Sequence, residues 1–175
     1  MLTKIDICSM ALLKIGERPI QSFNEDTSTA QIARTLFDPT TDALLARHPW
    51  GFASAEFELS KTSDGDFLIP VEVLRVLSCS AATFKINGDR ISAAPAKITI
   101  RAIVRVAPER LPSFFVSVLA TRLAMEFCMP ISDNQQAFNA LSVLFESELR
   151  AAKFIDSTMT TPAGINGFSL VNERF

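Results

Sequence analysis

The chain has 175 residues, of which 48% are hydrophobic and 21% charged, and its formal net charge is −2. This length fits one domain, or one domain with an appendage, and the apolar content is enough for a sizeable core. The near-neutral charge argues against a protein that grips nucleic acid, because such a protein needs a basic excess to displace counterions from phosphates.

The first third of the chain predicts two helices. Thr3 can cap the first, which is expected over residues 3–15 because apolar residues recur there at helical spacing. The second is expected over residues 28–47 on the same grounds. Pro39 lies inside that second pattern and predicts a kink or a break, since proline removes one backbone hydrogen bond from a helix.

The region from about residue 52 to 106 predicts an inserted, small antiparallel β-sheet. Its last stretch, residues 98–106, alternates apolar and polar side chains and therefore predicts a half-buried strand. Asn87-Gly88 lies between two alternating runs. This dipeptide predicts a type I′ hairpin turn, because both central residues of that turn need positive φ.

Residues 113–128 give the strongest helical signal in the chain. They are apolar almost all round except for a narrow polar stripe that contains Ser117 and Thr121, and this pattern predicts a buried helix. The segment approaches the length of a membrane span. Arg122 and Glu126 lie within it, however, and each would be costly in lipid, so a core helix is the better interpretation.

A second helix is expected over residues 133–155, after Pro130 ends the first and Ser132 or Asp133 caps the next. The short break makes the two helices antiparallel neighbours, and this hairpin is the predicted core of the protein. Residues 1–155 are thus expected to form one α+β domain, mainly α, in which a bundle of about four helices carries the β insertion.

Residues 156–175 predict an extended C-terminal arm. Small and polar residues dominate its first half, which cannot bury enough apolar area to order itself. Apolar residues return at the end, so the arm is interpreted as a spacer with a docking segment, and a frayed terminus is the alternative. Docking would use backbone hydrogen bonds along a sheet edge and apolar side chains in pockets. The candidate partner-binding residues of the arm are Phe168, Leu170, Val171 and Phe175.

The sequence offers no motif that predicts catalysis, a cofactor or a metal. It lacks a glycine-rich phosphate loop and a nucleophile elbow. Its single histidine, His48, is better explained as a residue near a helix end than as a catalytic base. Cys8, Cys79 and Cys128 are far apart and form no CxxC pair, so they are interpreted as small core residues. No catalytic, cofactor-binding or metal-binding residue is assigned, and the chain is not expected to be an enzyme.

Four stretches of the chain together resemble one known family. They are residues 5–16 followed by Arg18-Pro19-Ile20, residues 37–53, Ile69-Pro70 with residues 74–77, and residues 115–124. The most specific piece is Arg47-His48-Pro49-Trp50-Gly51-Phe52-Ala53. The pattern resembles the tail tubular protein A family of tailed bacteriophages, which are also called head-to-tail connectors or adaptors.

This resemblance implies a structural role in the virion. Family members form a ring of about twelve copies beneath the portal, so the resemblance implies that a closed ring of this chain extends the DNA channel. It also implies that the portal and a tail nozzle or tail-tube protein are partners. DNA would pass through without sequence-specific binding, and no membrane would be involved. The expected location is the head–tail interface of a virion assembled in the host cytoplasm.

The alternative is a small self-associating helical scaffold, or an uncharacterised enzyme, that is not of phage origin. The mean hydropathy of +0.24 favours self-association in either case. It indicates that some apolar surface is covered by other chains.

Overall fold

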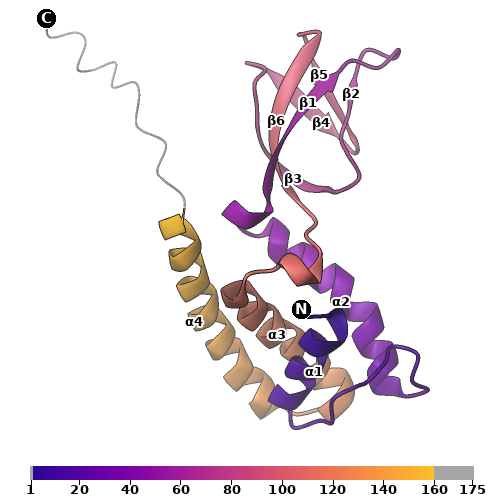
Figure 1. Cartoon of the computed structure of the whole chain (residues 1–175), viewed down its shortest axis with the longest axis vertical. Helices are drawn as coiled ribbons and strands as arrows, with labels where there is room; N and C mark the ends of the chain where they lie inside the picture. The colour runs from indigo at the N-terminus through magenta and orange to yellow at the C-terminus, as the bar shows by residue number, and fades with distance from the viewer. Residues whose placement is uncertain (1, 160–175) are drawn as a thin grey trace, which may run out of the picture.

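The computed structural model describes residues 2–159, which form a helical bundle joined to a β part (Figure 1). The helices are α1 (Lys4–Lys14), α2 (Ser28–Ala46), α3 (Ser113–Phe127) and α4 (Gln135–Met159). The strands are β1 (Ser54–Ser60), β2 (Phe67–Leu68), β3 (Val73–Cys79), β4 (Phe84–Asn87), β5 (Arg90–Ala93) and β6 (Lys97–Val104). The α+β class, mainly α with a small antiparallel insertion, is confirmed.

Helix α3 is the centre of the bundle and packs against α1, α2 and α4. Ten of its 15 residues are buried, because its sequence is apolar on nearly every side. The segment Ser113–Ser132 is apolar and long enough to cross a membrane by composition alone, and 61% of its most apolar window is buried inside the protein. That degree of burial is typical of the core helix of a folded bundle.

The helix ends agree only in part with the sequence prediction. Thr3 and Asp6 form a reciprocal capping box at the start of α1, as the Thr3 prediction requires. Helix α2 runs unbroken across Pro39, so the predicted break does not occur. Proline removes one hydrogen bond, and burial of residues on both sides of it, such as Phe37 and Leu44, offsets that loss.

The turn between α3 and α4 also differs from the prediction. Helix α3 passes into a π-helical turn, η3 (Cys128–Ser132), and Asp133 then adopts a left-handed conformation with φ of 45°. Asn134, and not Ser132 or Asp133, caps α4, since its side-chain oxygen accepts from the N–H of Ala137 at 3.0 Å.

Helix α4 is longer than predicted and includes Asp156 to Met159, which were expected to begin the arm. Asp156 is buried, and its carboxylate accepts from the N–H of Gly51 at 3.0 Å. This contact fastens the end of α4 to the joint between the bundle and the β part. The sequence prediction placed Asp156 in the arm because small and polar residues dominate the stretch that it begins.

The β part consists of two three-stranded antiparallel sheets, with strand orders β1-β6-β3 and β2-β5-β4. They enclose a second, smaller core that includes Phe67, Ile91, Ile98 and Ile100. On β6 the alternation predicted from the sequence is present, because Ile98 and Ile100 belong to this core while Thr99 and Arg101 are exposed. Ile103, near the end of β6, belongs instead to the core of the bundle and links the two regions.

The hairpin turn lies one residue later than predicted. Asn87 pairs with Arg90, so the two turn residues are Gly88 and Asp89. Gly88 has a φ of 60°, whereas Asp89 does not have positive φ. A glycine at the first central position with a normal second residue is typical of a type II′ turn, so the predicted type I′ turn is wrong.

Candidate partner-binding surfaces

The Arg47 to Ala53 segment forms the joint between the helical bundle and the β part. Trp50 is fully buried, and its indole N–H donates to the carbonyl of Leu44 at 3.2 Å. Its ring meets Phe115 of α3 edge-on, with centroids 5.2 Å apart. From the β side, the guanidinium of Arg75 donates to the carbonyl of Ala46 at 3.0 Å. This segment therefore fixes the two regions to each other, and its tryptophan is a core residue.

His48 lies beyond the end of α2 and takes part in the same joint. Its ring packs edge-on against Trp50, with centroids 4.7 Å apart, and its Nε2 lies 3.8 Å from the carboxylate of Asp156. Burial lowers the pKa of His48, the nearby charge of Lys153 lowers it further, and Asp156 acts in the opposite direction. These contacts give the histidine a structural role at the joint.

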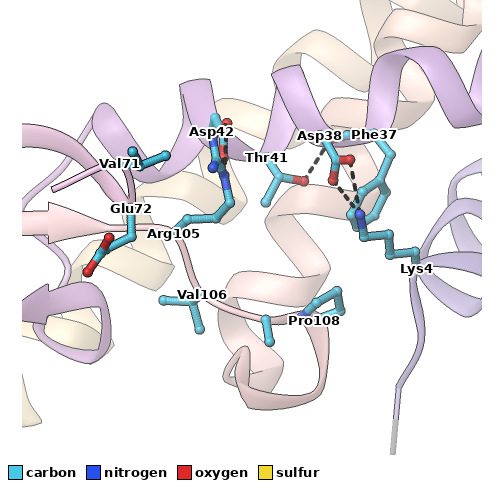
Figure 2. Close-up of a pocket in the computed structure, with 11 residues that line it drawn as sticks. Lys4, Phe37, Asp38, Thr41, Asp42, Val71, Glu72, Arg105, Val106 and Pro108 are labelled. Carbon is cyan, nitrogen blue, oxygen red and sulfur yellow. Dashed lines mark hydrogen bonds and ion pairs between the residues drawn. The ribbon is translucent and has the colours of Figure 1, made fainter. Parts of the chain in front are cut away.

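A hollow of about 470 Å³ opens beside this joint, between α2, the start of α1 and the chain that follows β6 (Figure 2). Its apolar lining includes Phe37, Val106 and Pro108. Two ion pairs stand at its rim. Lys4 Nζ lies 2.7 Å from an oxygen of Asp38. The other pair is Arg105 with Asp42, in which Arg105 Nε donates at 2.9 Å.

Both cations of this hollow are already paired with carboxylates. Asp42 raises the pKa of Arg105 through hydrogen bonds and its charge, and so keeps the guanidinium occupied. The hydroxyl of Thr41 donates to the carbonyl of Phe37. With its cations paired and its hydroxyl engaged, the hollow lacks the surplus positive charge or the activated nucleophile of a phosphate site or an acyl-transfer site. An apolar floor with a charged rim suits an apolar side chain of a partner protein.

The polar stripe of α3 is used inside the bundle. Thr121 is fully buried and donates to the carboxylate of Glu148 on α4, while Lys14 at the end of α1 donates to the Thr121 hydroxyl at 2.7 Å. Ser117 also donates to Glu148, at 3.2 Å. Glu146, two residues earlier, pairs instead with Arg47. The stripe is thus a hydrogen-bonded network that fixes the register of three helices.

The described residues contain no cluster of three or more metal-ligating side chains. Burial raises the pKa of the Cys8 thiol to about 12, so this cysteine is an inert core residue at neutral pH. The candidate arm residues Phe168, Leu170, Val171 and Phe175 all lie outside the described part of the chain.

The geometry alone does not identify the family of the protein, and comparison with known proteins does. Residues 5–159 match the model of the tail tubular protein family, so the match covers both the bundle and the β part. The chain belongs to the tail tubular protein family. The protein is therefore a structural component of a bacteriophage tail, in agreement with the resemblance noted in the sequence. The family is not one of enzymes. A search of curated proteins gave no match.

A structural protein of a tail contacts other proteins through its surface, and we first define two exposed apolar surfaces within residues 2–159. The first, which we call the α4 outer face, consists of Ala140, Val143, Leu144, Ser147, Ala151 and Phe154. Val143 is 75% exposed and Phe154 is 70% exposed. The second, which we call the β patch, consists of Leu68, Val71 and Ile86 around a hollow of about 620 Å³. Contiguous exposed apolar residues of this kind mark interaction sites.

Sequence reasoning missed the α4 outer face although its signal was present. The residues that face α3, such as Leu141, Phe145 and Leu149, defined the apolar side that the pattern predicted. Val143 and Phe154 fall on the opposite side of the same helix, where charged residues are usual. A helix with apolar residues on both sides is typical of one that packs on its own core with one side and on another surface with the other.

Proposed function

We propose that this chain is a head-to-tail adaptor that forms a ring beneath the portal, extends the DNA channel and gives the tail its attachment platform. The observation that carries the proposal is the match to the tail tubular protein family across residues 5–159. Within that family, an adaptor role requires three kinds of contact: with neighbouring copies, with the portal and with the tail nozzle or tail tube.

The exposed surfaces of the chain support this division of contacts. The α4 outer face and the β patch lie on different regions, the bundle and the β part (Figure 1). A subunit of a ring needs such separate surfaces, because neighbours lie beside it while other proteins lie above and below it. The formal net charge of −2 fits a channel through which DNA passes without being gripped.

The C-terminal arm is the proposed portal contact. Phe168, Leu170, Val171 and Phe175 supply apolar side chains, and the sequence between α4 and these residues is rich in small and polar residues. Attachment through such a spacer makes the arm's contact effectively intramolecular once the subunit is in place, so a weak contact still secures the ring. The portal is the first candidate for the acceptor, and a neighbouring adaptor subunit is the second.

Mass photometry of the chain with and without the portal protein of its phage tests the proposal. The expected result is a monomer that predominates when the chain is alone and a multi-copy assembly when the portal is added, because a template enforces the rotation that closes a ring. A stable closed dimer whose mass is unchanged by the portal would contradict the proposal.

A further inference from the structure

The α4 outer face is unusual for the solvent side of a helix. From Ala140 to Phe154 it extends over roughly 21 Å, at about 1.5 Å per residue. The centre of this face carries small or apolar side chains, and Arg150 is the charged residue that lies nearest to that centre, at its edge. Small residues at positions 140, 147 and 151 alternate with the larger Val143 and Phe154. This alternation of small and large side chains leaves grooves into which a second helix fits.

Helix α1 has an exposed apolar face of its own. In the helix Leu13 is 61% exposed and Met10 is 38% exposed, and Leu2, which lies just before the N-cap Thr3, is 39% exposed. These three residues define what we call the α1 outer face. At helical spacing Asp6 shares this face. Hydrogen bonds from Thr3 lower the pKa of Asp6, so the carboxylate is charged at neutral pH.

The two faces complement each other in charge as well as in apolar character. The α4 outer face is bordered by the cation of Arg150, whereas the α1 outer face includes the anion of Asp6. Two α4 faces brought together would place like charges near each other, as would two α1 faces. An α4 face against an α1 face pairs opposite charges at the edge of an apolar contact, which favours this pairing over the other two.

The positions of the helices allow this contact to repeat. Figure 1 shows α4 on one side of α3 and α1 on the other, and both helices pack on α3. Helix α2 also lies on the side of α3 where α1 lies, so the α4 outer face and the α1 outer face belong to opposite sides of α3, and α1 shares its side with α2. If each α4 contacts the α1 of the next copy, the row of helices continues from subunit to subunit, and such head-to-tail contacts close into a ring when the rotation permits.

We infer that the partner of the α4 outer face is the α1 outer face of a second copy of this chain. The inference rests on the proposed ring, and it names the surfaces by which neighbouring subunits meet. It also explains why a helix of a soluble bundle has apolar residues on the side away from its own core.

Disulfide trapping tests the contact directly. Ser147→Cys places a thiol in the α4 outer face and Leu13→Cys places one in the α1 outer face, each in a Cys79→Ala background because Cys8 and Cys128 are buried. Under mild oxidation with the portal protein, the chain that carries both cysteines is expected to give a ladder of covalent oligomers. A mixture of the two single-cysteine chains is expected to give only the mixed dimer. The control chain keeps Leu13→Cys and carries Ser63→Cys, at an exposed turn of the β part, in place of Ser147→Cys; it is expected to give no ladder.

Two outcomes would overturn the inference. Dimers from Ser147→Cys alone would show that α4 meets α4, and cross-linking no greater than that of the Ser63→Cys control would show that the faces do not meet. If the wild-type chain still assembles on the portal in either case, the proposed function stands while this contact fails. If the portal recruits no copies of the wild-type chain but the ladder forms without it, the contact stands and the proposed function fails.

A charge-insertion experiment tests the same contact without cysteines. Val143→Asp and Phe154→Asp each place a carboxylate in the α4 outer face opposite the expected Asp6, and each is expected to lower assembly on the portal by about tenfold. Phe84→Asp changes a residue of the β part that is 43% exposed and serves as the matched control, with assembly unchanged. Both α4 variants are expected to keep the wild-type melting temperature, because these side chains are exposed. Assembly of both α4 variants at the wild-type level would contradict the inference.

Discussion

The helical bundle and the β part obtain their stability in different ways. The bundle has one large core around α3, and its buried polar network joins α1, α3 and α4. The β part has a small core between two three-stranded sheets, and its β4 strand is exposed along its whole length. Trp50 and Ile103 connect the two regions. Trp50 lies in the joint and Ile103 lies on β6, and both side chains belong to the core of the bundle. From this difference we expect the bundle to fold as a unit and the β part to depend on it for support.

The largest effect is expected from damage to the core of the bundle. Leu123 is fully buried in α3, so Leu123→Ala removes packed atoms and leaves a cavity, which costs roughly 2–5 kcal/mol in the free energy of unfolding. Denaturant unfolding followed by circular dichroism measures this cost. Leu13→Ala on the exposed side of α1 is the matched control and should change stability by less than about 0.5 kcal/mol. A similarly small change for Leu123→Ala would mean that α3 is not the central helix.

A smaller effect is expected in the β part. Gly88→Val forces a β-branched residue into positive φ at the β4–β5 turn and should cost about 1–2 kcal/mol. Gly88→Asn is the matched control, because asparagine tolerates positive φ better than valine. Backbone amide hydrogen exchange would locate the loss of order in β4 and β5. Complete unfolding of the chain by Gly88→Val would show that the bundle depends on the β part, which is the opposite of the expected dependence.

The fold could be predicted from sequence where one physical pattern dominates. Helix α3 is apolar all round and β6 alternates, so both were recognisable from periodicity alone. The turn at Gly88 was misplaced by one residue, since register depends on how both strands pair. Asp156 was assigned to the arm because small and polar residues follow it in the sequence. Only the fold shows that its carboxylate accepts a hydrogen bond from the N–H of Gly51.

The partner surfaces were less predictable for a related reason. Val143 and Phe154 lie on a helix whose core-facing residues already explained its apolar content, so their exposure follows only from the packed bundle. The ion pair of Arg105 with Asp42 joins residues that are 63 positions apart, and a local sequence pattern cannot predict such a pair. The family resemblance, by contrast, was present in contiguous stretches such as residues 47–53, and the match over residues 5–159 agrees with it.

A second comparison is between residues 2–159 and the C-terminal arm that follows them. Removal of residues 160–175 is expected to leave the melting temperature nearly unchanged and to lower affinity for the portal at least tenfold, about 1.4 kcal/mol. Phe168→Asp should cause much of this loss, and Asn166→Asp within the spacer is the control of equal charge. Titration of the portal with each chain at equal salt measures the effect. Equal affinity of the intact and truncated chains would show that the portal contact lies on the folded domain.

The smallest effect concerns the pH dependence of the joint. The pKa of His48 is lowered from 6.5 in the folded chain, chiefly by burial, so the unfolded chain takes up a proton first as the pH falls. Stability from the neutral histidine is therefore fully present above about pH 6.5 and is lost as the pH falls through the lowered pKa. The free energy of unfolding of the wild type and of His48→Gln, compared between about pH 7.5 and 5.5, should show a shallower dependence in the variant. If the free energy of unfolding changes equally with pH in the wild type and in His48→Gln, His48 has the same pKa in the folded and unfolded chains.

The most direct test of the adaptor role is an electron-microscopic view of the portal mixed with this chain. The expected result is a closed ring of copies at one end of the portal, coaxial with it, with an open channel through the middle. The adaptor role would be contradicted by a portal that carries no added ring, or by a chain that remains a closed dimer beside it.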